Sequence, residues 1–425
     1  MDRYDGPFDP AFHLAQLSRP TLAALGREYM LFGHLLNRAA LPAVHMSLGA
    51  DAREAVAIAE WMGASPIYTR RMQQRMKFAG TDVGTIFKGF QLDVGFPHQY
   101  MDVHYHLESA ERGYFWLQRC GALLEVEPYG EGAVRSMCHA IEDPTFDATA
   151  VATNPRARCR PIHRPPRRPS DRVPHCRWEV FVDPAARPIE QPLLTTRVGA
   201  SRLAAFAFAP VSSSAVGGRD DYAGDFDADF RLEDLSHRAL VGVCQEFLLQ
   251  NHLLVRALMM EVADRGGEEL AARIGTAQFI GAGAVAAGRV QRAVGISGSG
   301  VAPIVKMLQL HPAFVPEYVR LGAAVDGADR GRVWIEDCAA LDESDRFGWV
   351  PLLADGATAA LEAVVQALDP RARCLATSRP YARLAWDVVV DGAAEPAEVP
   401  APAAMVVATG TARFTFAPDG PAGGR

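Results

Sequence analysis

The sequence predicts an α+β fold made of two tandem copies of one unit, packed together as a pseudo-dimer. Each unit is expected to have an N-terminal helical layer and a mainly antiparallel sheet. Three observations predict this fold. The segment FDPAFHLAQLS at Phe8 matches FDADFRLEDLS at Phe226. Apolar residues recur every three or four positions early in the first copy, as on a helix. Later the period falls to two, which is typical of strands.

The duplication is read from one register held over a long distance. An offset of 218 holds without a gap from Phe8 to Cys120, and it pairs Lys88 with Lys306. The offset shortens to 215 at Asn154 and to 208 at Trp178, so the second copy carries two deletions. Deletions of this kind are expected in loops, because loops tolerate them better than strands do.

These patterns predict the boundaries of the two copies and the helices and strands of the first copy. We expect a first unit at residues 8–210, a Ser/Gly/Asp linker at residues 211–225 and a second, degenerate unit at residues 226–418. In the first unit the periodicity predicts helices and strands. The helices are expected within residues 14–62 and at 67–76, 83–92 and 144–152; the strands at 100–107, 113–120 and 176–183, with a strand-like ending at 206–210 matched by 414–418.

Composition narrows the class of protein. The chain has 43 basic and 50 acidic residues, so no overall charge attracts it to nucleic acid or to an anionic membrane. The N-terminus lacks the apolar run of a signal peptide, and no stretch approaches the 18 apolar residues of a membrane span. We therefore expect a soluble, cytoplasmic protein with reduced cysteines and a small-molecule partner. The sequence leaves open whether the protein forms a homo-oligomer.

The duplication also supplies an internal control for function. Residues kept in both copies are expected to serve the shared fold, and reactive residues found in one copy are candidates for chemistry. Cys138, His139, His163, His175 and Cys176 have no cysteine or histidine at the corresponding positions of the second copy. Thiolate and imidazole are ligands for zinc or iron, so Cys138, Cys176, His139 and His175 form a candidate metal site. Alternatively, the cysteines pack in the core and the histidines are solvated loop residues.

A second metal candidate lies on an expected strand. Alternation places Asp102, His104 and His106 on one strand face, where imidazoles could share an ion. The alternative is a polar strand face exposed to water.

Carboxylates and arginines complete the set. Glu142 and Asp143 are candidates for a general base, or for capping ahead of Pro144. A Pro-rich segment concentrates arginines, including Arg164 and Arg167, and guanidinium forks bind carboxylate or phosphate. With His163 they are the candidate substrate-binding residues, and a solvated loop paired with the acidic surface is the alternative.

The order Cys120, Cys138 with Asp143, Asn154-Pro155, Arg164-Pro-Pro-Arg167 and His175-Cys176-Arg-Trp178 resembles the L-2-amino-thiazoline-4-carboxylic acid hydrolase-like family. It more distantly resembles the 4-vinyl reductase domain. The resemblance covers about residues 100–183. It implies hydrolysis of a C=N or C–S bond in a small heterocycle bearing a carboxylate, with Cys138, Asp143 and Cys176 as the matched positions.

Two functional hypotheses follow. The first is a small-molecule hydrolase acting on an anionic heterocycle, with or without zinc or iron, in which Cys138, His139, Asp143 and Cys176 activate water. The second is a non-catalytic small-ligand-binding or sensor protein that uses the same pocket.

Overall fold

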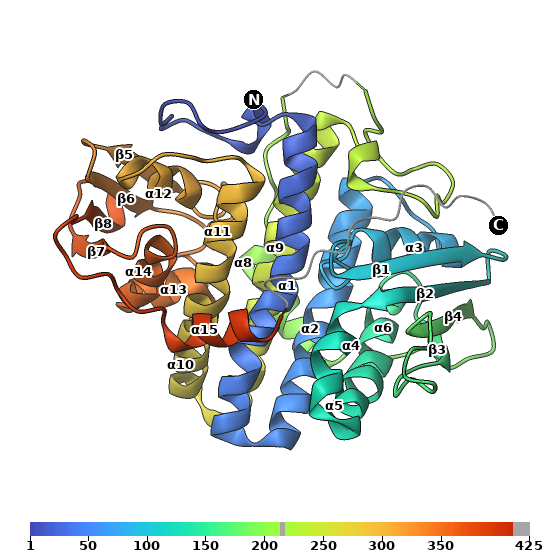
Figure 1. The fold of residues 1–425 in the computed structure, drawn as a ribbon. Coiled ribbons are helices and arrows are strands. Elements are labelled where there is room, and N and C mark those ends of the chain that lie inside the picture. Colours follow the sequence, from blue (N-terminus) through green and yellow to red (C-terminus); the bar gives the residue numbers. More distant parts are fainter. Residues whose placement is uncertain (213–216, 411–425) are drawn as a thin grey trace.

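The computed structural model describes residues 1–212 and 217–410, and they form two units of the same architecture (Figure 1). The helical elements of the first unit are η1 (Leu14–Gln16), α1 (Arg19–Leu48), α2 (Ala50–Arg75), α3 (Val83–Gln91), α4 (Gly121–Val126), η2 (Glu127–Tyr129), α5 (Glu131–Arg135), η3 (Ser136–Ile141), α6 (Glu142–Val151), α7 (Leu193–Gly199) and α8 (Arg202–Ala205). Those of the second unit are η4 (Leu232–Asp234), α9 (His237–Gly266), α10 (Glu268–Gln278), η5 (Phe279–Gly283), α11 (Ala284–Ala293), α12 (Val301–Leu308), α13 (Trp349–Ala354), α14 (Thr358–Gln366) and α15 (Ala401–Ala408).

Each unit has one four-stranded sheet in which every pairing is antiparallel. The strand order is β1-β2-β4-β3 in the first unit and β5-β6-β8-β7 in the second, so the topology is the same. The predicted α+β fold of two tandem units is therefore confirmed. The strands are β1 (Met101–Leu107), β2 (Arg112–Cys120), β3 (Ala157–His163), β4 (Cys176–Val182), β5 (Leu321–Val325), β6 (Arg330–Glu336), β7 (Ala372–Thr377) and β8 (Ala382–Val390).

Both units open with a 30-residue helix that turns sharply into the next helix. The turn is made by Gly49 after α1 and by Gly267 after α9, with φ values of 91° and 85°. A residue with a Cβ adopts this conformation at a cost, which explains glycine at both equivalent positions. Ser236 caps α9 by accepting a hydrogen bond from the backbone N–H of Ala239.

The two units meet along their long helices, which lie side by side in the middle of the molecule (Figure 1). Buried amides tie the units together. The Asn251 amide donates to the Tyr29 carbonyl at 2.8 Å, and the Tyr29 hydroxyl donates to the Leu310 carbonyl at 2.7 Å. Both donors are buried, so these hydrogen bonds fix how the helices pack.

The segment before each long helix crosses to the other unit. The Lys88 ammonium donates to the Tyr222 carbonyl at 3.0 Å, and the equivalent Lys306 donates to the Tyr4 carbonyl at 3.3 Å. Each lysine also lies over the ring of the same tyrosine, 4.8 Å from its centroid. This reciprocal exchange is what a pseudo-two-fold axis requires.

Most of the helices and strands predicted for the first unit are present in the fold. The helices expected at 83–92 and 144–152 are present as α3 and α6, and three of the first unit's strands were predicted. Strand β3 was missed. The strand-like ending at 206–210 is wrong, because α7 and α8 precede an extended segment without strand pairing, and residues 414–418 lie outside the described residues.

The unit boundaries stay a prediction. Within the expected linker, Tyr222 is buried and its hydroxyl donates to Gln91 of the first unit.

Among the described residues one helical stretch, Glu268–Ala293, is long and apolar enough to cross a membrane by length and composition. Most of that stretch is buried inside the protein, as expected of a core helix.

Candidate functional site

A cavity of about 70 Å³ lies inside the first unit, between α1, α2, η3, α6 and the segment that joins α3 to β1. One water needs about 10 to 15 Å³ measured in this way, so the cavity holds a molecule of a few heavy atoms. Its wall is mixed. The polar lining side chains are His34, Asn37, Arg38, Ser65, Asp93, Glu142, Thr145 and Thr149, and the larger apolar ones are Leu41, Trp61, Phe96, Met101, Met137, Ile141 and Phe146.

Asp93 is the most fully hydrogen-bonded acid of this cavity. Its Oδ1 accepts from the Tyr68 hydroxyl at 2.8 Å and from the Gly95 N–H at 2.7 Å, and its Oδ2 accepts from Thr149 at 3.2 Å. The residue is 2% exposed. Burial raises the pKa of Asp93 to about 6, and the three hydrogen bonds oppose this rise. Near pH 7 the group is mostly an ionised base.

Glu142 is the second acid of the lining. It begins α6 directly after η3, a turn of π-helix, and such turns are frequent at functional sites. Burial raises its pKa to about 8, the neighbouring Asp143 raises it further, and Arg164 opposes both. The residue is 8% exposed, and among the described residues its Oε2 has no hydrogen-bond partner. Near pH 7 Glu142 therefore holds a proton.

A third acid, Glu60 on α2, lies behind the wall. It is 0% exposed, and neither carboxylate oxygen has a hydrogen-bond partner within residues 1–212 and 217–410. Burial raises its pKa well above the usual range, and the nearby Asn37 amide, which lines the cavity, opposes the rise. A buried carboxyl without a partner is costly, so this position calls for an explanation beyond stability.

Some of the lining belongs to the shared scaffold. Arg38 donates to Glu125 at 2.6 Å and to the Tyr100 hydroxyl at 3.1 Å. The second unit repeats this group with Arg256, Glu343 and Tyr318: Arg256 lies 3.5 Å from Glu343, and the Tyr318 hydroxyl donates to Glu343 at 2.7 Å. By the internal control, this set serves the fold.

The second unit fills the equivalent space with Trp349. Its indole stacks on Phe279 with centroids 4.4 Å apart and meets His252 edge-on, and these two residues correspond to Trp61 and His34. The indole N–H donates at 3.3 Å to Gln278, the counterpart of Glu60. A tryptophan thus satisfies the amide that replaces the unpartnered carboxyl.

Most of the polar lining residues are also replaced in the second unit. At the offsets set by the duplication, five polar lining residues become apolar or become a histidine that bonds the backbone. Asn37, Asp93, Glu142, Thr145 and Thr149 correspond to Val255, His311, Ala357, Ala360 and Val364.

The two cysteines expected to carry chemistry, Cys138 and Cys176, lie in the core of the first unit beside Glu142, together with Cys120, which both copies share. Cys138 comes from η3, Cys176 from the start of β4, and Cys120 from the end of β2. Burial raises the pKa of Cys120 to about 12 and those of Cys138 and Cys176 well above the usual range, and the Glu142 charge raises all three further. They are therefore protonated near neutral pH and pack as small apolar side chains.

Each of the three predicted histidines forms a hydrogen bond with a nearby backbone group. The His139 Nε2 lies 2.6 Å from the Pro165 carbonyl, and the His163 Nε2 lies 3.1 Å from the Pro174 carbonyl. His175 accepts from the Cys120 N–H at 3.1 Å through its Nδ1. Burial lowers the pKa of His175 to about 4, and the neighbouring Arg167 lowers it further. None of the three lines the cavity.

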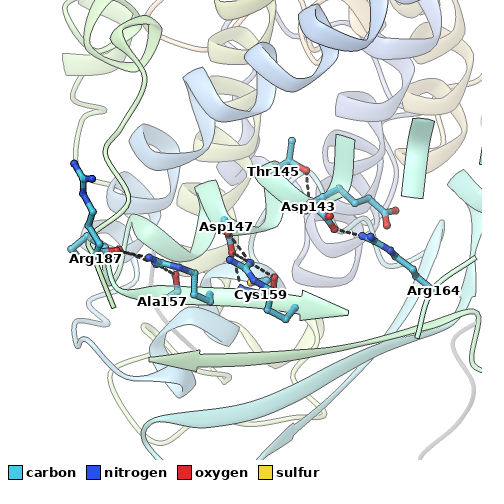
Figure 2. A network of polar contacts seen from close by, with 11 residues as sticks. Asp143, Thr145, Asp147, Ala157, Cys159, Arg164 and Arg187 are labelled. Carbon is cyan, nitrogen blue, oxygen red and sulfur yellow. Dashed lines mark hydrogen bonds and ion pairs between the residues drawn. The ribbon is translucent and has the colours of Figure 1, made fainter. Parts of the chain in front are cut away.

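The predicted arginines are engaged with acids outside the cavity. Figure 2 shows Arg164 paired with Asp143, while Asp147, one turn further along α6, faces β3. Arg167 makes a two-pronged pair with Glu127, both bonds being 2.7 Å long. Asp143 thus points to the surface, whereas its neighbour Glu142 lines the cavity.

The residues predicted to bind a metal are not clustered as ligands of one ion among the described residues. His104 lies 3.1 Å from Asp102 on β1 and stacks on Trp116, and His106 stacks on Tyr114. In the part of the chain that the structure describes, no group of three or more His, Cys, Asp or Glu side chains is placed to hold an ion. A zinc or iron site stays a prediction.

Comparisons with known proteins add no relative: no family model, no curated protein and no solved structure matches this chain. The site therefore has to be interpreted from its own geometry.

Asp93, Glu60 and Asn37 were missed by the sequence analysis. A usable signal exists in the offset of 218, which pairs them with His311, Gln278 and Val255. Comparison of the two copies at buried acids and amides on the helices therefore identifies these three residues as specific to the first unit.

Proposed function

We propose that the first unit is a small-molecule hydrolase that acts on a C=N bond, and that the second unit is its scaffold. One observation carries the proposal: two carboxyl groups, Asp93 and Glu142, line one cavity, and the second unit fills the equivalent space with Trp349. Their environments favour opposite protonation states near pH 7. A pair of this kind supplies a general base and a general acid in one place.

The chemistry balances with these two groups. The Glu142 carboxyl first gives its proton to the C=N nitrogen, and the Asp93 carboxylate then takes a proton from water as the water oxygen bonds to the C=N carbon. In the second step the Glu142 carboxylate takes the proton of the new hydroxyl as the carbonyl forms. Asp93 returns its proton to the leaving nitrogen, so the C–N bond breaks and both groups regain their starting states.

The resemblance found in the sequence supports the same reaction type, hydrolysis of a small C=N or C–S heterocycle. In the proposal, however, the catalytic pair is Asp93 and Glu142. Arg164 and Arg167, expected to hold an anionic substrate, are paired with Asp143 and Glu127 and do not line the cavity.

The test is turnover of small cyclic amidines, thiazolines and lactams by the full-length protein, followed by mass spectrometry of the opened product. Asp93→Asn and Glu142→Gln are each expected to lower kcat about 10² to 10⁴-fold, the usual contribution of general acid–base catalysis. Glu131→Gln is the matched control, because Glu131 is an exposed acid on α5 that pairs with Arg168.

Wild-type turnover in Asp93→Asn would remove the proposed base. If ligands bind to the cavity and none is hydrolysed, the second hypothesis, a non-catalytic ligand-binding or sensor protein, takes the place of the first.

A further inference from the structure

The ionisable groups around the cavity are mainly acids. Asp93 and Glu142 line it, and Glu60 lies behind Asn37 in the same wall. The cationic lining residue, Arg38, is already paired with Glu125 at 2.6 Å. His34 is neutral, because burial lowers its pKa to about 3. Among the lining residues no positive charge is left to meet an anion.

The unpartnered polar group of the lining is the Glu142 carboxyl. Glu142 is 8% exposed and its Oε2 has no hydrogen-bond partner among the described residues. An acceptor buried beside a cavity is satisfied at little cost by a donor that arrives with the ligand. Once Glu142 has lost its proton, Oε2 is an acceptor only, so a ligand that offers further acceptors would leave its own atoms and Oε2 unpaired.

The apolar part of the wall suits a flat group. Trp61, Phe96 and Phe146 line the cavity, and the rings of Phe96 and Phe146 are stacked with centroids 5.5 Å apart. Aromatic faces attract cations, most strongly where water is excluded. A planar cation with N–H donors at its edge meets both the aromatic and the acidic parts of this wall.

We infer that the ligand of this cavity is a small planar cation of the amidinium class that carries no carboxylate. This inference rests on the proposed function, because it names the substrate class of the same site. It also fits the chemistry: transfer of the Glu142 proton to a C=N nitrogen creates an amidinium paired with a carboxylate. The carbon of that cation is the one that water attacks.

The test uses three probes of nearly identical shape that differ in charge: acetamidinium, acetamide and acetate. Their binding to the full-length protein is measured by calorimetry at pH 7.5. Acetamidinium is expected to bind at least about tenfold more tightly than acetamide, because only the cation pairs with buried carboxylates, and acetate is expected not to bind. Asp93→Asn and Glu142→Gln should each weaken acetamidinium binding about tenfold or more, and Glu131→Gln should leave it unchanged.

A second readout separates this role from a merely structural one. Binding of the cation should release the Glu142 proton, which calorimetry in buffers of different ionisation enthalpy detects. Glu142→Gln should abolish the release, and Asp93→Asn should retain it. The inference is overturned if acetate or acetamide binds as tightly as acetamidinium, or if none of the three binds. Binding of acetamidinium with no turnover of any cyclic amidine would support the inference and contradict the hydrolase.

Discussion

At equivalent positions of the shared fold, the second unit has a tryptophan side chain and the first unit has a cavity. In the second unit the Trp349 indole packs between Phe279 and His252 and donates to Gln278. In the first unit the same point is a cavity, and Glu60 stands unpartnered in place of the glutamine. The contacts that hold the units together, such as those of Lys88 and Lys306, are kept in both.

This difference separates the residues that both units share from those for which we propose a role in ligand binding. Filling an interior with an aromatic side chain stabilises it through burial and dispersion. A cavity lined by buried carboxyl groups gives up that stability. Functional sites commonly carry such costs, so the first unit has the features of a site and the second those of a support.

The largest expected effect comes from removing the tryptophan. Trp349→Ala should destabilise the protein by about 3 to 5 kcal/mol, because it opens a cavity and removes the donor to Gln278. Urea unfolding measures this. Trp334→Ala is the control, since that indole lies half-buried on the sheet, stacked with Arg379. A loss no larger than that of the control would show that Trp349 does not fill the second unit.

The next effect is a pH dependence confined to the first unit. The pKa of Glu142 is raised from 4.5 to about 8, so the folded state binds its proton more tightly than the unfolded chain does. That stability is fully present below pH 4.5 and is lost as the pH rises through 8. Wild type should therefore lose on the order of 4 kcal/mol more than Glu142→Gln between pH 5 and 9. The ionisable groups that act on or with Glu142 are Asp143, Arg164, Cys120, Cys138 and Cys176, and Asp93, His34 and Arg38 line the same cavity.

Urea unfolding at the two pH values tests this prediction, with Glu131→Gln as the control. Parallel pH profiles for wild type and Glu142→Gln would mean that the Glu142 carboxyl is solvated rather than enclosed.

A smaller effect, of equal size in the two units, is expected where Lys88 and Lys306 contact the segments that precede α9 and α1. Lys88→Met and Lys306→Met each leave buried carbonyls without a donor, which costs about 1 to 3 kcal/mol. Because the contacts are equivalent, the two losses of unfolding free energy should agree within about 1 kcal/mol. Clearly different losses would break the pseudo-two-fold relation of the segments.

The smallest effect concerns one hydroxyl. Thr149→Val introduces the residue that the second unit has, and it should change stability by less than about 1 kcal/mol. The variant removes a donor to Asp93 that lowers its pKa, so the Asp93 pKa should rise above that of wild type. Carboxyl-carbon NMR titration measures the shift, and an unchanged pKa would show that Thr149 does not bond Asp93 in solution.

The sequence predicted the fold better than the site. The offsets of 218, 215 and 208 revealed the duplication because a repeat needs no knowledge of packing. Strand β3 escaped because its alternation lasts only from Ala157 to Arg160, where Pro161 breaks it. Its residues pair at the sheet edge, where polar side chains and proline are tolerated.

The site depends on contacts between distant segments. Glu142 was a candidate beside Asp143, but sequence cannot say which of two adjacent acids turns inward. Asp93 follows a helix in a segment without any motif, and its role comes from Tyr68 and Thr149, which lie far from it in the chain.

The measurement that tests the central claim most directly is a crystal structure of the full-length protein soaked with acetamidinium. The account predicts the cation in the cavity of the first unit, within hydrogen-bond distance of Asp93 and Glu142, and the Trp349 indole in the equivalent place of the second. A first-unit interior closed by its own side chains, or a cation bound only elsewhere, would contradict it.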